Sequence, residues 1–215
     1  MTYLEAINSV LRRLREDQAD TALESDYSAL IGDFINDAKR MVENSWNWSA
    51  LRVTTVIPTV SGTSEYSITG SGQEAVIKAV INDTSNRFMK LESEAYFNNV
   101  YYNQDVVSGS PVAYKVTGVD SNDDLKVKVY PKPDAVYSLR VDLSRPQGII
   151  TADSTKINVP YNPVVQMAYA MALRERGETG GQSAAEQFAV ASTALSDAIA
   201  IDANRFPDET TFMVV

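Results

Sequence analysis

Apolar residues near the N-terminus recur every three or four positions, which is the spacing of one helix face. This pattern predicts a helix over residues 2–15, opened by a capping box of Thr2 and Glu5. A wider apolar stripe over residues 25–45 predicts a longer helix that packs against two neighbours. The stripe of the first helix comprises Leu4, Ile7, Leu11 and Leu14.

Two more helices are predicted near the C-terminus. The first has Asn162 as its N-cap and Pro163 in the first helical position, and Gly177 follows its last turn. The second opens with a box of Ser183 and Glu186 and is rich in alanine, which permits close approach of a neighbouring helix. Because neither pair of helices could bury its apolar stripe alone, we expect all four to form one antiparallel bundle.

Between these helical ends the apolar positions alternate with polar ones. Leu125 and Val127 alternate with Lys126 and Lys128, and turn residues separate successive runs, as in a half-buried antiparallel meander. The predicted strands cover residues 51–57, 64–68, 75–81, 87–91, 112–117, 125–130, 136–143 and 155–159. The pattern therefore predicts an antiparallel β-sandwich or barrel-like module.

The predicted fold class is α+β, with a helical domain that is discontinuous in sequence. Residues 1–49 and 160–204 supply the bundle, and residues 50–159 form an inserted β module with a short helix near residues 93–102. Residues 205–215 form an extended C-terminal tail that we expect to dock on a partner or on its own domain.

Composition narrows the chemistry that this fold could support. The chain of 215 residues contains neither histidine nor cysteine, which excludes Ser-His-Asp catalysis, the common zinc sites and disulfides. No apolar run approaches the roughly 20 residues that span a bilayer, and the N-terminus does not resemble a signal peptide. We therefore expect no catalytic residue, no metal, no cofactor and no membrane association.

Two carboxylate patterns are candidate sites. Glu92 and Glu94 flank the short helix and are candidates for carboxylate-only chemistry, such as glycoside hydrolysis. The segment Asp120–Asp124 resembles the opening of a calcium loop, but Leu125 stands where that loop needs glycine and Pro131 where it needs glutamate. A hairpin turn is the favoured interpretation of this segment.

Two groups of aromatic residues are candidate contact sites. Trp46 and Trp48 are expected to fill the junction between bundle and sheet, with a stacking platform for nucleic acid or sugar as the alternative. Four aromatics on or after the short helix exceed what such a helix can bury, which indicates a partner-binding surface. They are Tyr96, Phe97, Tyr101 and Tyr102.

The C-terminal tail and one cluster of arginines complete the candidates. The tail of residues 205–215 includes Phe206 and ends in an apolar run, which either folds back on its own domain or binds a partner. That run comprises Phe212, Met213, Val214 and Val215. The arginines either pair with acids of an adjacent subunit or satisfy the end of their own helix. They are Arg12, Arg13 and Arg15.

Three segments carry a family resemblance. The helix pair ends in NSWNWS, the β region contains Gly109-x-Pro111-x-x-Tyr114, and LKVKVYPKPD runs from Leu125 to Asp134. Together with the two closing helices and the tail, they resemble the head-to-tail adaptors of T7-like short-tailed bacteriophages, the family of tail tubular protein A. The resemblance covers nearly the whole chain in order and length.

The resemblance implies a structural virion protein of the tail or neck, assembled in the cytoplasm of the host bacterium. Such adaptors form a ring, usually of twelve copies, that joins the portal protein to the tail nozzle protein. Double-stranded DNA passes through the ring without specific binding. The net charge of −9 agrees with this, because acidic walls repel phosphates.

Two alternatives remain open at this point. A virion-associated carbohydrate-binding or cell-wall-degrading module would act through the β region and would depend on Glu92 or Glu94. A connector from the neck of a long-tailed phage would share the structural class and differ only in its partners.

Overall fold

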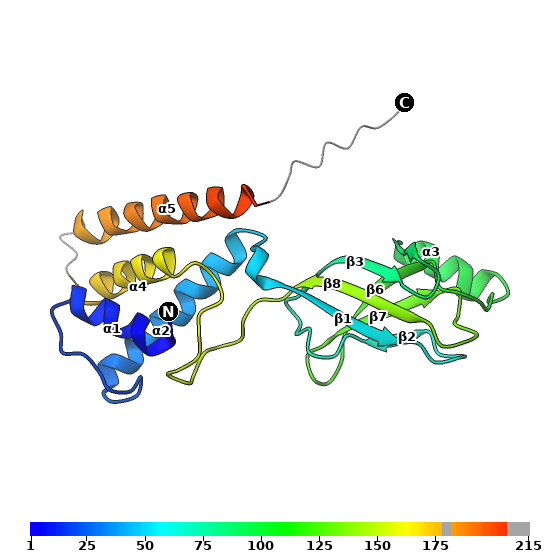
Figure 1. The fold of residues 1–215 in the computed structure, drawn as a ribbon, viewed down its shortest axis with the longest axis horizontal. Coiled ribbons are helices and arrows are strands. Elements are labelled where there is room, and N and C mark those ends of the chain that lie inside the picture. Colours follow the sequence, from blue (N-terminus) through cyan, green and yellow to red (C-terminus); the bar gives the residue numbers. More distant parts are fainter. Residues whose placement is uncertain (178–181, 206–215) are drawn as a thin grey trace, which may run out of the picture. The chain divides into compact units, whose positions relative to one another are not determined.

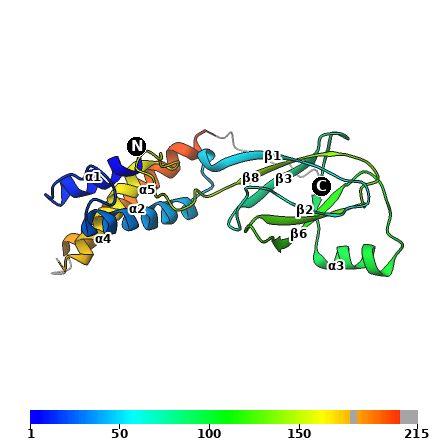
Figure 2. The ribbon, with the colours of Figure 1, turned by 90° about the horizontal axis from the view of Figure 1, so that it is seen from below.

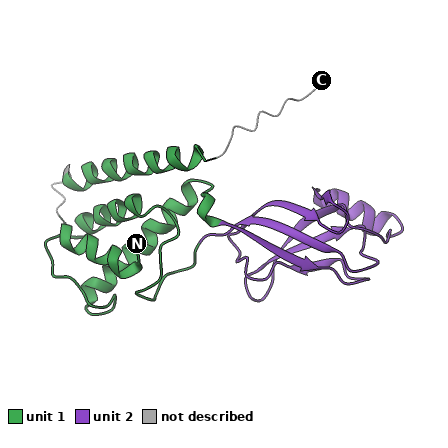
Figure 3. Cartoon of the chain, viewed as in Figure 1, with its two compact units in different colours: residues 1–51, 147–215 green, residues 52–146 purple. Residues whose placement is uncertain are grey.

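The computed structural model describes residues 1–177 and 182–205 (Figure 1). Two compact units divide the chain: residues 1–51 with 147–215, and residues 52–146 (Figure 3). The described residues contain five α-helices and two open sheets, so the α+β class is confirmed and the sheets do not close into a barrel. Residues 147–159, which the strand pattern assigned to the β module, fall within the helical unit.

Helices α1 (Tyr3–Arg13) and α2 (Asp26–Ser45) begin where their capping residues predict. The Thr2 amide donates to Glu5 Oε2 at 2.8 Å, and the Glu5 amide donates to Thr2 Oγ1 at 3.3 Å. Ser25 caps α2 in the same reciprocal way with Ser28. These side chains satisfy backbone groups that the first turn of a helix leaves unpaired.

Helices α4 (Tyr161–Glu175) and α5 (Gln182–Ala203) follow the β unit in sequence. The prediction of Asn162 as the N-cap was wrong, because α4 begins two residues earlier than predicted, after Pro160, and no side chain caps it. Ser183 likewise lies inside α5 rather than before it. Gly177 has φ of +66°, a left-handed conformation that ends α4 as predicted.

The helical unit is built around α4, which contacts α1, α2 and α5. Helix α5 runs alongside α4 in both views (Figures 1 and 2). The contact uses a narrow buried stripe of α5 spaced seven residues apart, and small side chains let the two backbones approach closely. That stripe consists of Ala184, Ala191 and Ala198. Much of the rest of α5 is exposed.

The β unit holds two four-stranded sheets. Their inward side chains belong to one hydrophobic cluster, to which Val141 of the first sheet and Val129 of the second both contribute. The first sheet has the order β1 (Arg52–Pro58), β8 (Ser138–Ser144), β3 (Val76–Asn82), β4 (Arg87–Phe88). The second has the order β2 (Glu65–Ser67), β7 (Leu125–Tyr130), β6 (Ala113–Val119), β5 (Lys90–Leu91).

Two strand predictions were wrong. Residues 87–91 divide between the sheets, because the buried Met89 separates β4 from β5, and β5 pairs parallel to β6 rather than antiparallel. Residues 155–159 form only an isolated bridge between Thr2 and Lys156. Their alternating Ile157 and Val159 are buried in the helical core instead. Alternation of apolar and polar residues alone does not distinguish a strand from an irregular segment that packs on a helical core.

The turn between β6 and β7 uses its acids to bind backbone. Asp120 Oδ1 accepts from the amides of Asn122 at 2.8 Å and Asp124 at 3.0 Å. The Asp124 carboxylate accepts from the amides of Gly70 at 2.8 Å and Gly72 at 3.0 Å. The segment is therefore a hairpin turn whose last acid also holds the Gly70–Gly72 turn.

A polar stripe on α2 holds the chain where it returns from the β unit. Asn36 exchanges two hydrogen bonds with the backbone of Ile150, at 2.9 and 3.0 Å. The buried Lys39 donates to the carbonyls of Gln147 and Gly148, and Glu43 Oε1 accepts from the Gln147 amide at 3.0 Å. Burial lowers the pKa of Lys39 and raises the pKa of Glu43.

Candidate assembly surfaces

The C-terminal end of α5 is anchored by one buried carboxylate. Asp202 accepts from Trp46 Nε1 at 3.2 Å, from the Ser49 amide at 3.0 Å and from Ser49 Oγ at 2.6 Å. Arg205 Nη1 lies 3.2 Å from Asp202 Oδ1. Burial raises the pKa of Asp202, but the hydrogen bonds from Ser49 and Trp46 together lower it by more. The pKa of Asp202 is therefore below its usual value.

The two tryptophans lie in the helical unit and have different environments. Trp48 is fully buried in the helical core and donates from Nε1 to the Val42 carbonyl at 2.7 Å. Trp46 is partly exposed and holds Asp202. Both therefore tie the end of α2 to its own unit, and their predicted place at a junction with the sheet stays a prediction.

A groove of 460 Å³ lies beside this anchored end of α5. One wall comes from the segment before α4, including Val159 and Pro160, and the other from the last turns of α5, including Ala198 and Ile201. Two apolar side chains at the groove are open to solvent, with Tyr161 54% and Ile201 62% exposed, whereas Trp48, Ile157 and Val159 are buried. Such exposure of neighbouring apolar side chains is typical of a binding surface.

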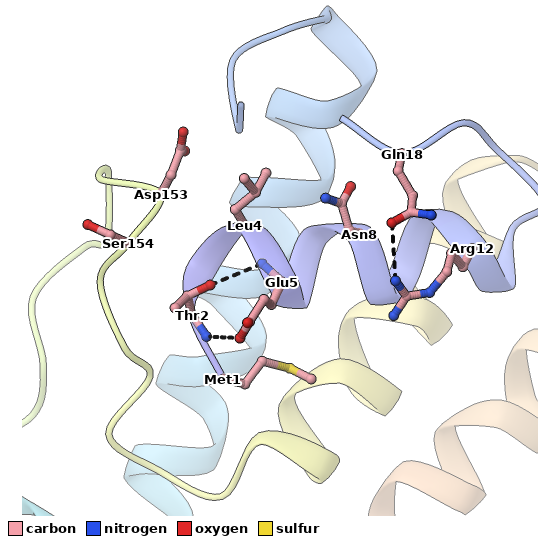
Figure 4. Close-up of a pocket in the computed structure, with 9 residues that line it drawn as sticks. All are labelled: Met1, Thr2, Leu4, Glu5, Asn8, Arg12, Gln18, Asp153 and Ser154. Carbon is pink, nitrogen blue, oxygen red and sulfur yellow. Dashed lines mark hydrogen bonds between the residues drawn. The ribbon is translucent and has the colours of Figure 1, made fainter. Parts of the chain in front are cut away.

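A second hollow, of 720 Å³, lies along α1 (Figure 4). Several polar side chains along it already have protein partners: Thr2 binds Glu5, and Arg12 donates to Gln18 Oε1 at 3.3 Å (Figure 4). Asn8 likewise exchanges two hydrogen bonds with the backbone of Ala19. These bonds give the hollow a structural role between α1 and its neighbouring segments.

The predicted arginine cluster is partly displaced from its helix. Helix α1 ends at Arg13, so Arg15 lies beyond it, with φ of +60°. The carbonyl of Leu14 accepts instead from Arg176 Nη1 at 3.4 Å, and Arg176 also pairs with Glu16. Sequence reasoning missed Arg176, because its position after α4 gives no signal that it reaches the end of α1.

The aromatic group predicted on the short helix is mainly an intramolecular cluster. It lies on α3 (Glu94–Asn98) and on the π-helical turn Asn99–Asn103. Phe97 is buried, and the rings of Tyr96 and Tyr101 pack edge-on against Tyr130 at 6.1 and 5.7 Å between centroids. Tyr102 is 77% exposed and is the member that remains available to a partner.

Each candidate catalytic carboxylate is paired with a lysine. Glu92 Oε1 lies 2.7 Å from Lys90 Nζ, and Glu94 Oε2 lies 2.5 Å from Lys115 Nζ. Among residues 1–177 and 182–205, no group of three or more acids is placed to hold a metal ion. Nothing in the described residues shows catalytic activity.

The predicted tail contacts lie outside the described residues. These are Phe206, Phe212, Met213, Val214 and Val215. Within the part of the chain that the structure covers, no helix combines the length and apolar character needed to cross a membrane.

Comparison with known proteins identifies a family over nearly the whole chain. A protein-family model described as SU10 adaptor protein matches residues 1–211, which includes both compact units. The comparison with curated proteins finds no match.

Proposed function

Because the chain belongs to the SU10 adaptor protein family, we propose that it forms a ring that joins the portal to the tail nozzle of a phage. The protein is a structural adaptor of the phage virion, and its class is the phage head–tail adaptor. The finer assignment to the tail tubular protein A group of T7-like phages is part of the proposal. The observation that carries the adaptor role is the family match across residues 1–211, whereas the T7-like assignment rests on the resemblance of the sequence segments alone.

Ring formation is supported by the outer face of α5. Ala185, Ala189 and Val190, which is 49% exposed, are open to solvent there, among polar residues such as Glu186 and Thr193. A second copy packed on this face would remove that apolar surface from water. We propose a closed ring of about twelve copies, as in the resembling adaptors.

The arginines near the end of α1 are the proposed polar part of the same interface. Arg12, Arg13 and Arg15 are exposed, and α2 exposes Asp33 and Asp37. Pairs between arginine and carboxylate across a subunit boundary would fix the register of the ring.

The charge of the chain supports passage of DNA through the ring. At −9 per subunit, a ring wall carries a high density of negative charge and repels phosphates. DNA would then slide through the channel without specific binding. Tyr102 in the β unit and the tail residues 212–215 are the proposed contacts with neighbouring virion proteins.

The test is a phage that carries a stop codon early in the gene for this chain. We expect heads that package DNA but lack tails, and restoration of tailed particles when the chain is supplied from a plasmid. Tailed, infectious particles produced without the chain would contradict the proposal.

A cell-wall assay separates this role from the carbohydrate alternative. Purified protein is added to a suspension of host cell walls, and turbidity is followed for the natural chain and for Glu92→Gln and Glu94→Gln. We expect no clearing by any of them. Clearing that depends on either glutamate would support the enzymatic alternative.

A further inference from the structure

The groove beside α5 lies where the last ten residues begin. Ile201 and Arg205 line it, and residues 206–215 follow directly in the sequence. We propose that, in the unassembled subunit, this groove binds the apolar C-terminal segment Phe212–Val215 of the same chain. The inference does not depend on ring formation, since it concerns a single chain in solution.

The lining of the groove suits an apolar segment. Its walls include two prolines, Pro160 and Pro163, and small residues of α5 such as Ala194 and Ala198, which present little polar surface. Ile201 stands at the rim and is 62% exposed. Covering apolar surface of this kind contributes about 25 cal/mol for each Å² removed from water.

The polar lining of the groove also includes Asn158, Asn162 and Asp197, but the two charged groups at the end of α5 do not oppose this occupant. The Asp202 carboxylate already accepts hydrogen bonds from Trp46 and Ser49, so it requires no water on the groove side. The guanidinium of Arg205 is largely exposed at the rim. It lies three and four positions before Asp208 and Glu209, which suits attraction between these charges.

The length of the segment permits a return to the groove. Residues 206–211 span up to about 20 Å when extended, at about 3.3 Å per residue. The groove-lining part of α5, from Ala194 to Asp202, rises about 12 Å at 1.5 Å per residue. The six connecting residues therefore suffice for Phe212–Val215 to lie back along α5.

Covalent attachment favours the same chain over a second copy. A segment joined to its site by a short connection has an effective concentration in the millimolar range. A subunit at micromolar concentration would therefore bind its own segment before that of another copy. A virion partner that takes up the segment must first displace it from the groove.

Trp46 gives a readout beside the groove, because it is 38% exposed and its Nε1 donates to Asp202, which lines the groove. Acrylamide quenching of tryptophan fluorescence is compared between the full chain and a chain that ends at Arg205. We expect stronger quenching in the truncated chain, and a return to the full-chain value when a peptide of residues 206–215 is added. Equal quenching in both chains would overturn the proposal.

Point variants locate the binding site on α5. In the full chain, Ile201→Glu should raise acrylamide quenching to the level of the chain that ends at Arg205. In that shorter chain, Ile201→Glu should prevent the added peptide from lowering the quenching. Val190→Glu is the matched control, because Val190 is on the same helix, is 49% exposed and does not line the groove. Rescue by the peptide despite Ile201→Glu would overturn the site.

A pair of variants in the segment tests its chemistry without touching the folded core. The double variant Phe212→Ser with Met213→Ser should be quenched as strongly as the truncated chain. The double variant Thr210→Ser with Thr211→Ser should be quenched only as much as the natural chain. Light scattering on the same samples should give the mass of one chain. Protection that appears only together with a doubled mass would assign the segment to a second copy and overturn the proposal.

Discussion

Single side chains in this protein stabilise turns by replacing backbone partners. The Asp124 carboxylate accepts hydrogen bonds from two amides of the Gly70–Gly72 turn. Asn36 forms two hydrogen bonds with the backbone of Ile150, as a neighbouring strand would do. Tyr3 is a residue whose close packing restricts a substitution on the neighbouring helix. Its ring lies against Gly32 of α2, where an added Cβ would come within 3.2 Å of Tyr3 Cζ.

Because of Asp124, we expect the folded protein to lose stability in acid. The amides of Gly72 and Gly70 lower its pKa below the usual 3.8, because they stabilise the charged form. A lowered pKa in the folded state adds stability above the unfolded pKa, and this stability is lost as pH falls below it. Asp124→Asn should therefore weaken the acid dependence of urea unfolding between pH 5 and pH 3, about the ordinary range of aspartate titration.

Asp123→Asn is the matched control for this experiment. Asp123 is exposed and has φ of +61°, a conformation that asparagine also tolerates. Near-UV circular dichroism follows unfolding, and amide exchange at Gly70 and Gly72 gives a local readout. If Asp124→Asn and Asp123→Asn show the same pH dependence, the Asp124 carboxylate does not stabilise the turn.

Gly32→Ala sets two effects against each other. Alanine favours a helix by about 1 kcal/mol over glycine. Crowding in a packed interior costs about 1–3 kcal/mol, and the buried Tyr3 ring leaves little room for a methyl group. We expect net destabilisation of about 1 kcal/mol in urea unfolding followed by tryptophan fluorescence.

Tyr3→Phe provides the partner variant, because it removes the hydroxyl that lies closest to the added methyl group. In that background Gly32→Ala should cost less or become stabilising. An increase in stability from Gly32→Ala in the natural background would show that the contact between α1 and α2 is looser than described.

At the scale of elements, the sequence predicted the helices and strands whose signals lie within a few neighbouring residues. The Thr2–Glu5 box and the period of the apolar residues located α1 and α2, because caps and stripes act within a few residues. The Ile157–Val159 alternation did not form a strand, since the helical core buries these residues. Arg176 and Asp202 act on residues more than a hundred positions away, so no local pattern reports them.

The polar stripe of α2 gives a prediction for one helix. Glu43→Ala would leave Lys39 buried without its carboxylate and the Gln147 amide without its acceptor. Removing one partner of a buried pair costs about 3–5 kcal/mol. Asn44→Ala, at the exposed next position, should change stability by less than about 0.5 kcal/mol.

Urea unfolding followed by the fluorescence of Trp46 and Trp48 measures both variants. Equal effects of Glu43→Ala and Asn44→Ala would mean that the stripe does not hold the return segment.

At the scale of the whole molecule, two cores divide the chain. The helical cluster draws on both ends of the sequence, and the β cluster lies within residues 52–146. Arg52 pairs with Ser144 in the β1–β8 register, so the β unit begins and ends at neighbouring positions. This is the arrangement of an inserted module, which a change of hydrophobic period can predict from sequence.

We expect residues 52–146 to fold alone. Their core and sheet pairing are complete within the unit, and their ends are adjacent. A fragment of these residues should show dispersed amide signals in NMR spectra and one cooperative urea transition. A fragment without a cooperative transition would show that the helical unit is required for the β core.

The proposed role of this chain as a ring-forming adaptor on a portal can be tested directly. The measurement mixes the purified chain with the portal ring of its own phage and determines the mass of the complex by light scattering. We expect a gain of about twelve subunits on each portal, as for a closed cyclic assembly. A portal mass that stays unchanged at micromolar concentrations of the chain would contradict this role.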